Sequence, residues 1–219
     1  MEGAGAASVL WKAGAPVATL RAALGVESAR RKQPAGLEAW RQEARLHAAL
    51  TKRLYETKAG PLTQLAELRA CKAYAVELEK RFPSDAVCLA YVAQLRQFTP
   101  GWLGGSLAEA EALFGKAVSN EATGEVCYLA AYFYLNLKPR AGPDDLAPVM
   151  RAEGLLASAE RKIVEDPEAD AERMAYLSTW IPYQQGVARF YSGDEGGARS
   201  RWAAHLRRFP GSYWGHYQL

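Results

Sequence analysis

The sequence has little charge of one sign, no long apolar run and few cysteines. Its 27 basic and 24 acidic residues leave a net charge of +3, which is too balanced to predict nucleic-acid binding. No apolar run approaches the ~20 residues that span a membrane, and Glu2 and Lys12 make the N-terminal stretch unlike a secretory signal. The odd set Cys71, Cys88 and Cys127 predicts buried thiols rather than disulfides or a zinc site. We expect a cytoplasmic protein that binds neither nucleic acid nor membrane.

Motifs of catalytic and nucleotide-binding sites are also missing. The histidines His47, His205 and His216 lie far apart in the sequence and match no metal-binding spacing. The sequence contains no GxSxG nucleophile turn and no Walker loop. The glycine-rich run 101–105 follows a predicted helix, which favours a plain turn over a phosphate cradle, and the acidic pair 144–145 is interpreted as a helix cap. We predict a protein that is not an enzyme and that holds no metal or cofactor.

The pattern of apolar residues predicts an all-α fold. Hydrophobic residues make up 49 % of the chain, alanine is abundant, and no stretch alternates in the manner of a strand. Gly25 is expected to end the first helix, and the run 99–105 is expected not to be helical. The expected helices are 16–24, 37–58, 63–82, 85–98, 106–120, 125–137, 146–164, one that reaches Tyr191 through Pro182, one from Asp194 to 209, and a short one after Pro210.

The stretch from Pro182 to Pro210 predicts two helices folded back on each other. Its small, aromatic and proline residues fall at fixed spacings, at Gly186, Gly193, Asp194, Ala198, Trp202 and Pro210. This spacing resembles the tetratricopeptide repeat, a helix–turn–helix unit of about 34 residues, although Pro182 and His205 depart from the usual residues of that family. The resemblance implies antiparallel helical hairpins stacked as a short right-handed solenoid. We divide the chain into an N-terminal extension and linker at 1–36, partly helical, and a repeat domain at 37–219.

The same resemblance places a partner-binding groove on the first helix of each hairpin. In the last hairpin the matching positions are Trp180, Tyr183, Gln184, Val187, Phe190 and Tyr191. In the hairpin that follows Pro83 they are Val87, Ala90, Tyr91, Gln94, Gln97 and Phe98. A surface of aromatic and amide side chains suits an extended peptide, because rings give contact area at small entropic cost and amides bond a main chain. The alternative is that most of these rings belong to the core.

The function that follows is a non-enzymatic adaptor that binds a protein or peptide through a concave, aromatic-lined face. This inference rests on fold-level analogy. A second hypothesis is a small-molecule or lipid-binding protein whose pocket is closed by the loops 99–105 and 138–145. A third is a structural subunit that assembles through its ends, because an incomplete stack needs a polar cap or a partner. The last hypothesis includes a homodimer through the C-terminal segment 213–219.

Overall fold

The protein is all-helical, as the sequence predicts. The computed structural model describes residues 15–31, 36–57, 60–140, 142, 144–165 and 171–219. In these residues there are ten α-helices, two short 3-10 helices and no strand, and 84 % of the structure is helical. The chain divides into two compact units, Met1–Asn120 and Glu121–Leu219. The proposed boundary between an extension at 1–36 and a domain at 37–219 stays a prediction.

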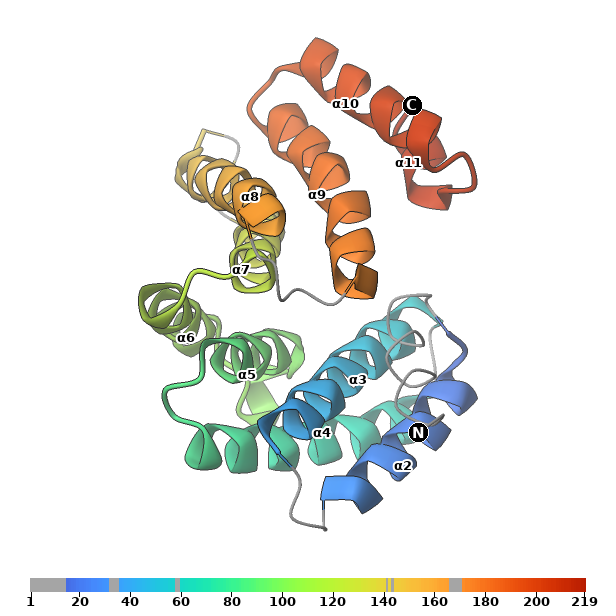
Figure 1. The fold of residues 1–219 in the computed structure, drawn as a ribbon, viewed down its shortest axis with the longest axis vertical. Helices are drawn as coiled ribbons and strands as arrows, with labels where there is room; N and C mark the ends of the chain where they lie inside the picture. Colours follow the sequence, from blue (N-terminus) through green and yellow to red (C-terminus); the bar gives the residue numbers. More distant parts are fainter. Residues whose placement is uncertain (1–14, 32–35, 58–59, 141, 143, 166–170) are drawn as a thin grey trace. The chain divides into compact units, whose positions relative to one another are not determined.

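Unit 1 is built from helices that follow one another closely along the chain (Figure 1). They are α2 (Val17–Arg31), α3 (Leu37–Glu56), α4 (Pro61–Arg81), α5 (Ala86–Phe98), the 3-10 helix η1 (Gly101–Leu103) and α6 (Leu107–Asn120). Helix α2 packs on α3 through a core that includes Leu20, Leu46 and Leu50. Burial of such apolar side chains supplies the main favourable free energy for ordering the helices.

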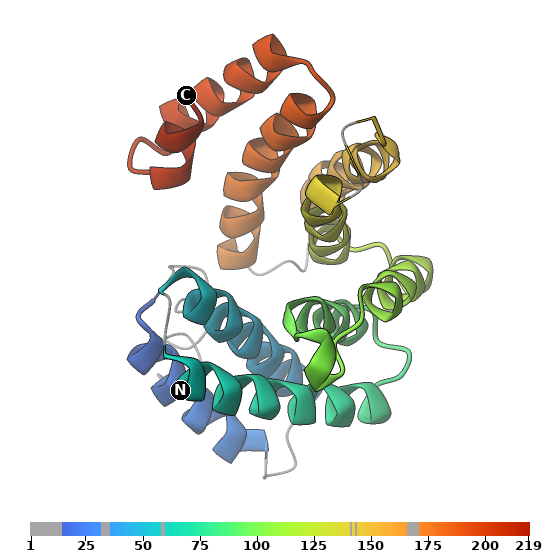
Figure 2. The same ribbon diagram turned by 180° about the vertical axis from the view of Figure 1, so that it is seen from behind.

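Unit 2 has a comparable set of helices, which Figure 2 shows from behind. They are α7 (Gly124–Leu137), η2 (Lys138–Arg140), α8 (Ala147–Glu165), α9 (Ala171–Tyr191), α10 (Glu195–Arg208) and the short C-terminal α11 (Tyr213–Gln218). Helix α9 continues through Pro182, as expected. The missing N–H of this proline leaves the carbonyl of Ser178 without its helical donor.

The two units share one pattern of helix packing. In unit 1, α3 contacts α4, and α5 contacts both of them as well as α6. In unit 2, α7 contacts α8, and α9 contacts both of them as well as α10. Each unit therefore holds two successive helix pairs, and the first helix of the second pair packs on both helices of the first. Most side chains of α5 are buried, as its contacts with α3, α4 and α6 require, and most side chains of α7 are buried as well.

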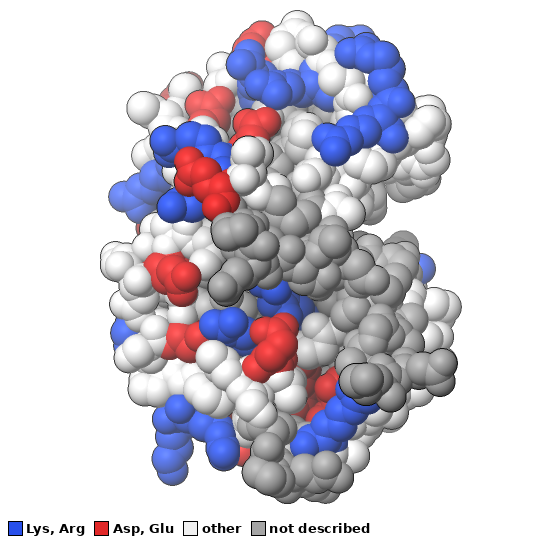
Figure 3. Space-filling view, viewed as in Figure 1, with Lys and Arg blue, Asp and Glu red and all other residues white. Residues whose placement is uncertain are grey.

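Charged side chains of both signs are interspersed over much of the face drawn in Figure 3. Several arginines of unit 1 form ion pairs between helices: Arg21 lies 2.6 Å from Glu67, Arg41 lies 2.5 Å from Asp85, and Arg96 lies 2.6 Å from Glu79. Solvent-exposed pairs of this kind each contribute little to stability, on the order of 0–1 kcal/mol. Their main effect is to leave few isolated charges on these helices.

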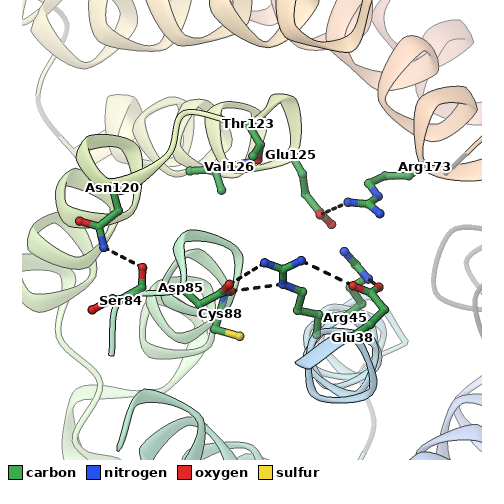
Figure 4. A network of polar contacts seen from close by, with 11 residues as sticks. Glu38, Arg45, Ser84, Asp85, Cys88, Asn120, Thr123, Glu125, Val126 and Arg173 are labelled. Carbon is green, nitrogen blue, oxygen red and sulfur yellow. Dashed lines mark hydrogen bonds and ion pairs between the residues drawn. The ribbon is translucent and has the colours of Figure 1, made fainter. Parts of the chain in front are cut away.

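Polar side chains begin the helices where the sequence predicts. Asp85 Oδ1 accepts a hydrogen bond from the Cys88 amide at 2.8 Å at the start of α5 (Figure 4). Ser106 accepts from the amide of Glu109 at 3.2 Å, as the predicted capping box requires. Gly193 has a positive φ of 86°, the left-handed conformation that favours glycine and ends a helix. These contacts satisfy backbone donors that a helix end leaves without partners.

Two local predictions are wrong. Gly25 does not end the first helix, because α2 continues to Arg31 and its second half makes polar contacts instead of apolar ones. There Glu27 is buried, and Ser28 Oγ donates to Glu43 Oε1 of α3 at 2.6 Å. The run 99–105 is not free of helix either, because Gly101–Leu103 forms one 3-10 turn. Short turns of this type are common connectors and carry no strong sequence signal.

The pair α9–α10 is held by a close approach at Gly186. The indole of Trp202 lies on this glycine, and its Nε1 donates to the backbone carbonyl of Tyr183 at 3.2 Å. A Cβ atom added at Gly186 would stand 2.4 Å from Trp202 Nε1. The small residue predicted at this crossing is therefore required by the ring that packs on it, and Ala198 beside Trp202 is fully buried.

We predict that Gly186→Ala lowers the free energy of unfolding by about 1–3 kcal/mol, because the added methyl group overpacks the Trp202 contact. The matched control is Gly154→Ala in the middle of α8, where nothing lies within 4 Å of an added Cβ. This control should be neutral or stabilising by about 0.5–1 kcal/mol, because alanine favours a helix interior. Urea unfolding followed by circular dichroism measures both. Equal stability of the two variants would contradict the packing described for Trp202.

Candidate partner-binding face

The α5 positions predicted to bind a partner offer little surface. Tyr91 is only 3 % exposed. Gln94, Gln97 and Phe98 are half-buried, and Val87 and Ala90 are buried. The Oε1 atoms of Gln94 and Gln97 are buried without a hydrogen-bond partner among the described residues. The structure thus places this set mostly inside unit 1, which agrees with the alternative that these side chains belong to the core.

The α9 positions divide between the core and the surface. Tyr183 is 7 % exposed, and its hydroxyl accepts a hydrogen bond from Gln218 Nε2 of α11 at 3.2 Å. Gln184 is also buried, whereas Trp180, Val187 and Tyr191 are half-buried. A tyrosine that packs in the core contributes stability rather than contact area for a partner.

Phe190 is the one exposed residue among the six positions predicted on α9. It is 49 % exposed, and its ring centroid lies 6.0 Å from that of Trp202 on α10. Tyr191 is the next ring, with its centroid 6.1 Å from that of Phe190. The structure therefore does not bring Phe190 together with Trp180.

Trp180 belongs instead to a cluster that the sequence interpretation did not identify. The ring centroid of Tyr176 lies 6.3 Å from that of Trp180 and 6.2 Å from that of Tyr128 on α7. The Tyr128 phenol interacts with the side chains of Tyr176 and Gln184. Tyr132 follows Tyr128 one turn later on α7 and is half-buried. We call this set the aromatic face: Tyr128, Tyr132, Tyr176, Trp180 and Gln184.

The sequence did contain a signal for these residues. Tyr128 and Tyr132 are four residues apart on one helix, and Tyr176 and Trp180 are four apart on another. The repeat positions were not extended to the helix 124–137. Tyr176 precedes the positions that match the repeat in the last hairpin, so it falls outside the predicted groove. Only the packing of α7 against α9 shows that the two spaced pairs meet.

The aromatic face is electrically neutral. Burial raises the pKa of Tyr128 well above its ordinary value, and the neighbouring hydroxyls of Tyr176 and Tyr132 raise it further, so the phenol stays protonated. Arg173 Nη1 on α9 lies 3.5 Å from Glu125 Oε2 on α7, and Figure 4 shows these two side chains pointing toward each other. A protonated phenol, an indole and an amide can pack on a chain and bond its backbone.

A second polar cluster lies inside unit 1. His47 Nδ1 is 3.4 Å from Cys71 Sγ, and His47 Nε2 is 3.9 Å from Glu43 Oε1. Thiol, imidazole and carboxylate in that order are the residue types of a nucleophilic site. However, all three are buried, and burial raises the pKa of Cys71 to about 11. The thiolate form of Cys71 is therefore disfavoured, and Thr51 Oγ1 lies 3.1 Å from Sγ as a further structural contact.

The remaining cysteines agree with the prediction of buried thiols. Cys71, Cys88 and Cys127 are free and buried, and burial raises the pKa of each. Among the residues that the structure describes, no group of three His, Cys, Asp or Glu side chains is placed to hold a metal ion. In the same part of the chain, none of the helices combines the length and apolar character that a membrane crossing requires.

His205 lies at the junction of α9, α10 and α11. It is buried, and its Nε2 lies 2.9 Å from Ser212 Oγ, which in turn accepts from the Gly215 amide at 3.2 Å. Its ring centroid is 5.6 Å from that of Tyr183. Burial lowers the pKa of His205, and the backbone of Thr179 opposes this in part. The folded protein therefore holds a neutral imidazole here.

We predict that acid destabilises unit 2 through His205. The unfolded chain takes up a proton near the ordinary pKa of about 6.5, above the folded value, so stability is lost as the pH falls below about 6.5. Free energies of unfolding at about pH 7.5 and about pH 5.5 measure the loss, and His205→Gln should reduce it. An unchanged loss in that variant would mean that His205 does not carry this pH dependence.

The aromatic face joins residues from two helices into one neutral surface. Its members come from α7 and α9, and the ion pair between Arg173 and Glu125 joins the same two helices. Burial raises the pKa of Tyr128, which is the direction opposite to that of an activated nucleophile. No family model, curated protein or solved structure matches this chain.

Proposed function

We propose that this protein is a helical-repeat adaptor that binds an extended segment of another protein on the aromatic face. The observation that carries the proposal is the packing pattern that both units share. A first helix that packs on both helices of the preceding pair is the arrangement from which stacked hairpins are built. Such a stack leaves one side of the first helices available to a guest, and α7 and α9 are the first helices of unit 2.

The residues at the α9–α10 crossing support the resemblance to the tetratricopeptide repeat. Gly186 and Ala198 are both small and buried, and Trp202 fills the space that Gly186 leaves. In the other unit, Ala110, Phe114 and Ala117 are buried along α6 at related spacings. A right-handed solenoid of antiparallel hairpins is the arrangement that we propose for these pairs.

The chemistry of the aromatic face suits a peptide in extended conformation. Tyrosine and tryptophan provide large contact areas with few rotatable bonds, so little entropy is lost when they are covered. Tyr132, Tyr176 and Trp180 are half-buried, which leaves part of each ring for a partner. The absence of a lone charge in this set favours a neutral or apolar segment over a strongly charged one.

The small-molecule alternative has less support. The loops 99–105 and 138–145 belong to different units, so each must be considered by itself. Trp102 in the first loop is 74 % exposed, and therefore does not cover an interior site. In the second loop, Lys138 Nζ donates to the carbonyls of Gly142 and Asp145 at 2.7 and 2.8 Å, which ties the loop to itself.

Assembly through the ends stays a further prediction. Trp214, Tyr217 and Leu219 are exposed at the C-terminal end, so a homodimer formed there would give a mass that rises with concentration in light scattering. The proposal of a non-enzymatic, cytoplasmic adaptor without a cofactor, nucleic acid or membrane partner likewise rests on the sequence interpretation given above.

The aromatic face can be tested with peptides selected from a displayed library against the full-length protein. Trp180→Ala and Tyr132→Ala should each weaken binding of the selected peptides about tenfold, because central aromatic residues dominate such interfaces. Fluorescence anisotropy with synthetic peptides measures the affinities. Thermal unfolding of each variant shows whether the fold is kept.

The matched control is Trp102→Ala, which removes an exposed tryptophan from unit 1. It should change the affinity by less than about twofold. The proposal fails if no peptide is selected. It also fails if the folded Trp180→Ala and Tyr132→Ala variants bind the selected peptides as the unmodified protein does.

A further inference from the structure

Helix α10 has a strong excess of one charge. From Glu195 to Leu219 the chain contains four arginines, and Glu195 is its only acidic residue. They are Arg199, Arg201, Arg207 and Arg208, and we call the side of α10 that carries Arg201 and Arg208, two helical turns apart, the arginine face. Figure 3 shows Lys and Arg side chains gathered in the region where Figure 1 places α10 and α11. Three of the four are exposed, and Arg201 is half-exposed.

These arginines differ from several arginines of unit 1 in having no acidic partner among the described residues. None of the four forms an ion pair with a residue in the described ranges, whereas Arg21, Arg41 and Arg96 each have one. Arg208 lies over the ring of Phe209, with its Cζ 5.5 Å from the ring centroid. The N–H donors of four guanidinium groups on one short helix are therefore available to a partner.

Helix stability alone does not account for this arrangement. Arg207 and Arg208 stand in the last turn of α10, where a positive charge favours the helix dipole. Arg199 and Arg201 lie in the first half of the helix and gain nothing from that dipole. Their charges repel the other two and destabilise the isolated helix, so a function in recognition is a better explanation.

The spacing of the arginines matches a short, extended acidic segment. Arg201 and Arg208 are seven residues apart, which is two helical turns or ~10.5 Å along one side. In a polyproline II segment, residues three apart point the same way and lie ~9.3 Å apart. Two glutamates at that spacing can each meet one guanidinium, and carboxylate–guanidinium pairs form bidentate hydrogen bonds.

An aromatic pair adjoins the arginine face. Trp214 and Tyr217 on α11 are 42 % and 70 % exposed, and their rings meet edge to face at 6.0 Å. Helix α11 packs on α10, and His205 links the two through Ser212. The rings of Trp214 and Tyr217 can therefore contact an apolar side chain that lies beside the acidic residues of a partner.

We infer that the arginine face binds a short acidic segment of a partner protein, with an apolar residue next to its carboxylates. The size of the face favours this partner over nucleic acid or a membrane. Helix α10 has 14 residues and is therefore ~21 Å long. A longer polyanion would pass onto the exposed carboxylate of Glu195 at the first turn of α10, which repels it. The arginine face shares no residue with the aromatic face, so each proposal can fail alone.

The test uses a fluorescent peptide with glutamate at every third position, prolines between and one leucine, added to the full-length protein. Arg201→Gln combined with Arg208→Gln should weaken its binding by at least about tenfold, because each lost charged pair typically costs a large factor. Raising the salt concentration should weaken binding to the unmodified protein. The same peptide with glutamine in place of glutamate should not bind.

The control is Arg161→Gln combined with Arg69→Gln, which removes two exposed arginines from α8 and α4. This control should bind the acidic peptide within about twofold of the unmodified protein. The inference is overturned if the acidic peptide does not bind, or if it binds both double variants equally. Binding of polyuridylate or phosphatidylserine vesicles through Arg201 and Arg208, without binding of the peptide, would also overturn it and assign the face to that polyanion.

Discussion

The fold of unit 2 depends on the packing of the Trp202 indole against the backbone of α9. This ring needs the space left by Gly186 and the carbonyl of Tyr183, which accepts its Nε1–H at 3.2 Å. The contact fixes both the distance between α9 and α10 and the rotation of α9 about its axis. Once that rotation is fixed, Tyr183 points to the junction with α11, and Trp180 lies beside Tyr176 and Tyr183.

The aromatic face is a consequence of this rotation. Tyr176 meets Tyr128 only because α9 presents that side to α7. The interactions of the Tyr128 phenol with Tyr176 and Gln184 reduce the cost of burying these polar groups. The core residue and the proposed binding residues of α9 are thus neighbours on one helix, separated by a fraction of a turn. This closeness explains why the repeat positions on α9 include both Tyr183, which is buried, and Trp180, which is not.

Prediction from the sequence was most accurate at positions where a local requirement of the backbone determines the residue type. The helices expected from 85, 106 and 194 begin at Asp85, Ser106 and Asp194, because capping requirements do not depend on the rest of the fold. Gly25 was misinterpreted because a glycine inside a helix costs only about 1 kcal/mol, which tertiary contacts such as Ser28 to Glu43 can offset. Periodicity shows which residues share a helix face, but not what covers that face. For this reason Tyr91 could be assigned to a surface, and the contact of His47 with Cys71 could not be foreseen.

The two proposed surfaces of unit 2 place different demands on the same pair of helices. The rings of the aromatic face already stabilise the contact of α7 with α9. A partner segment bound to these rings therefore changes the packing within unit 2. The arginine face consists of side chains that contribute little to the fold, because they are exposed or half-exposed and have no ion pair in the described structure. Changes at the second surface can therefore alter binding without altering stability, whereas changes at the first affect both. An adaptor with these properties could exchange its acidic partner freely while its aromatic face and core stay the same.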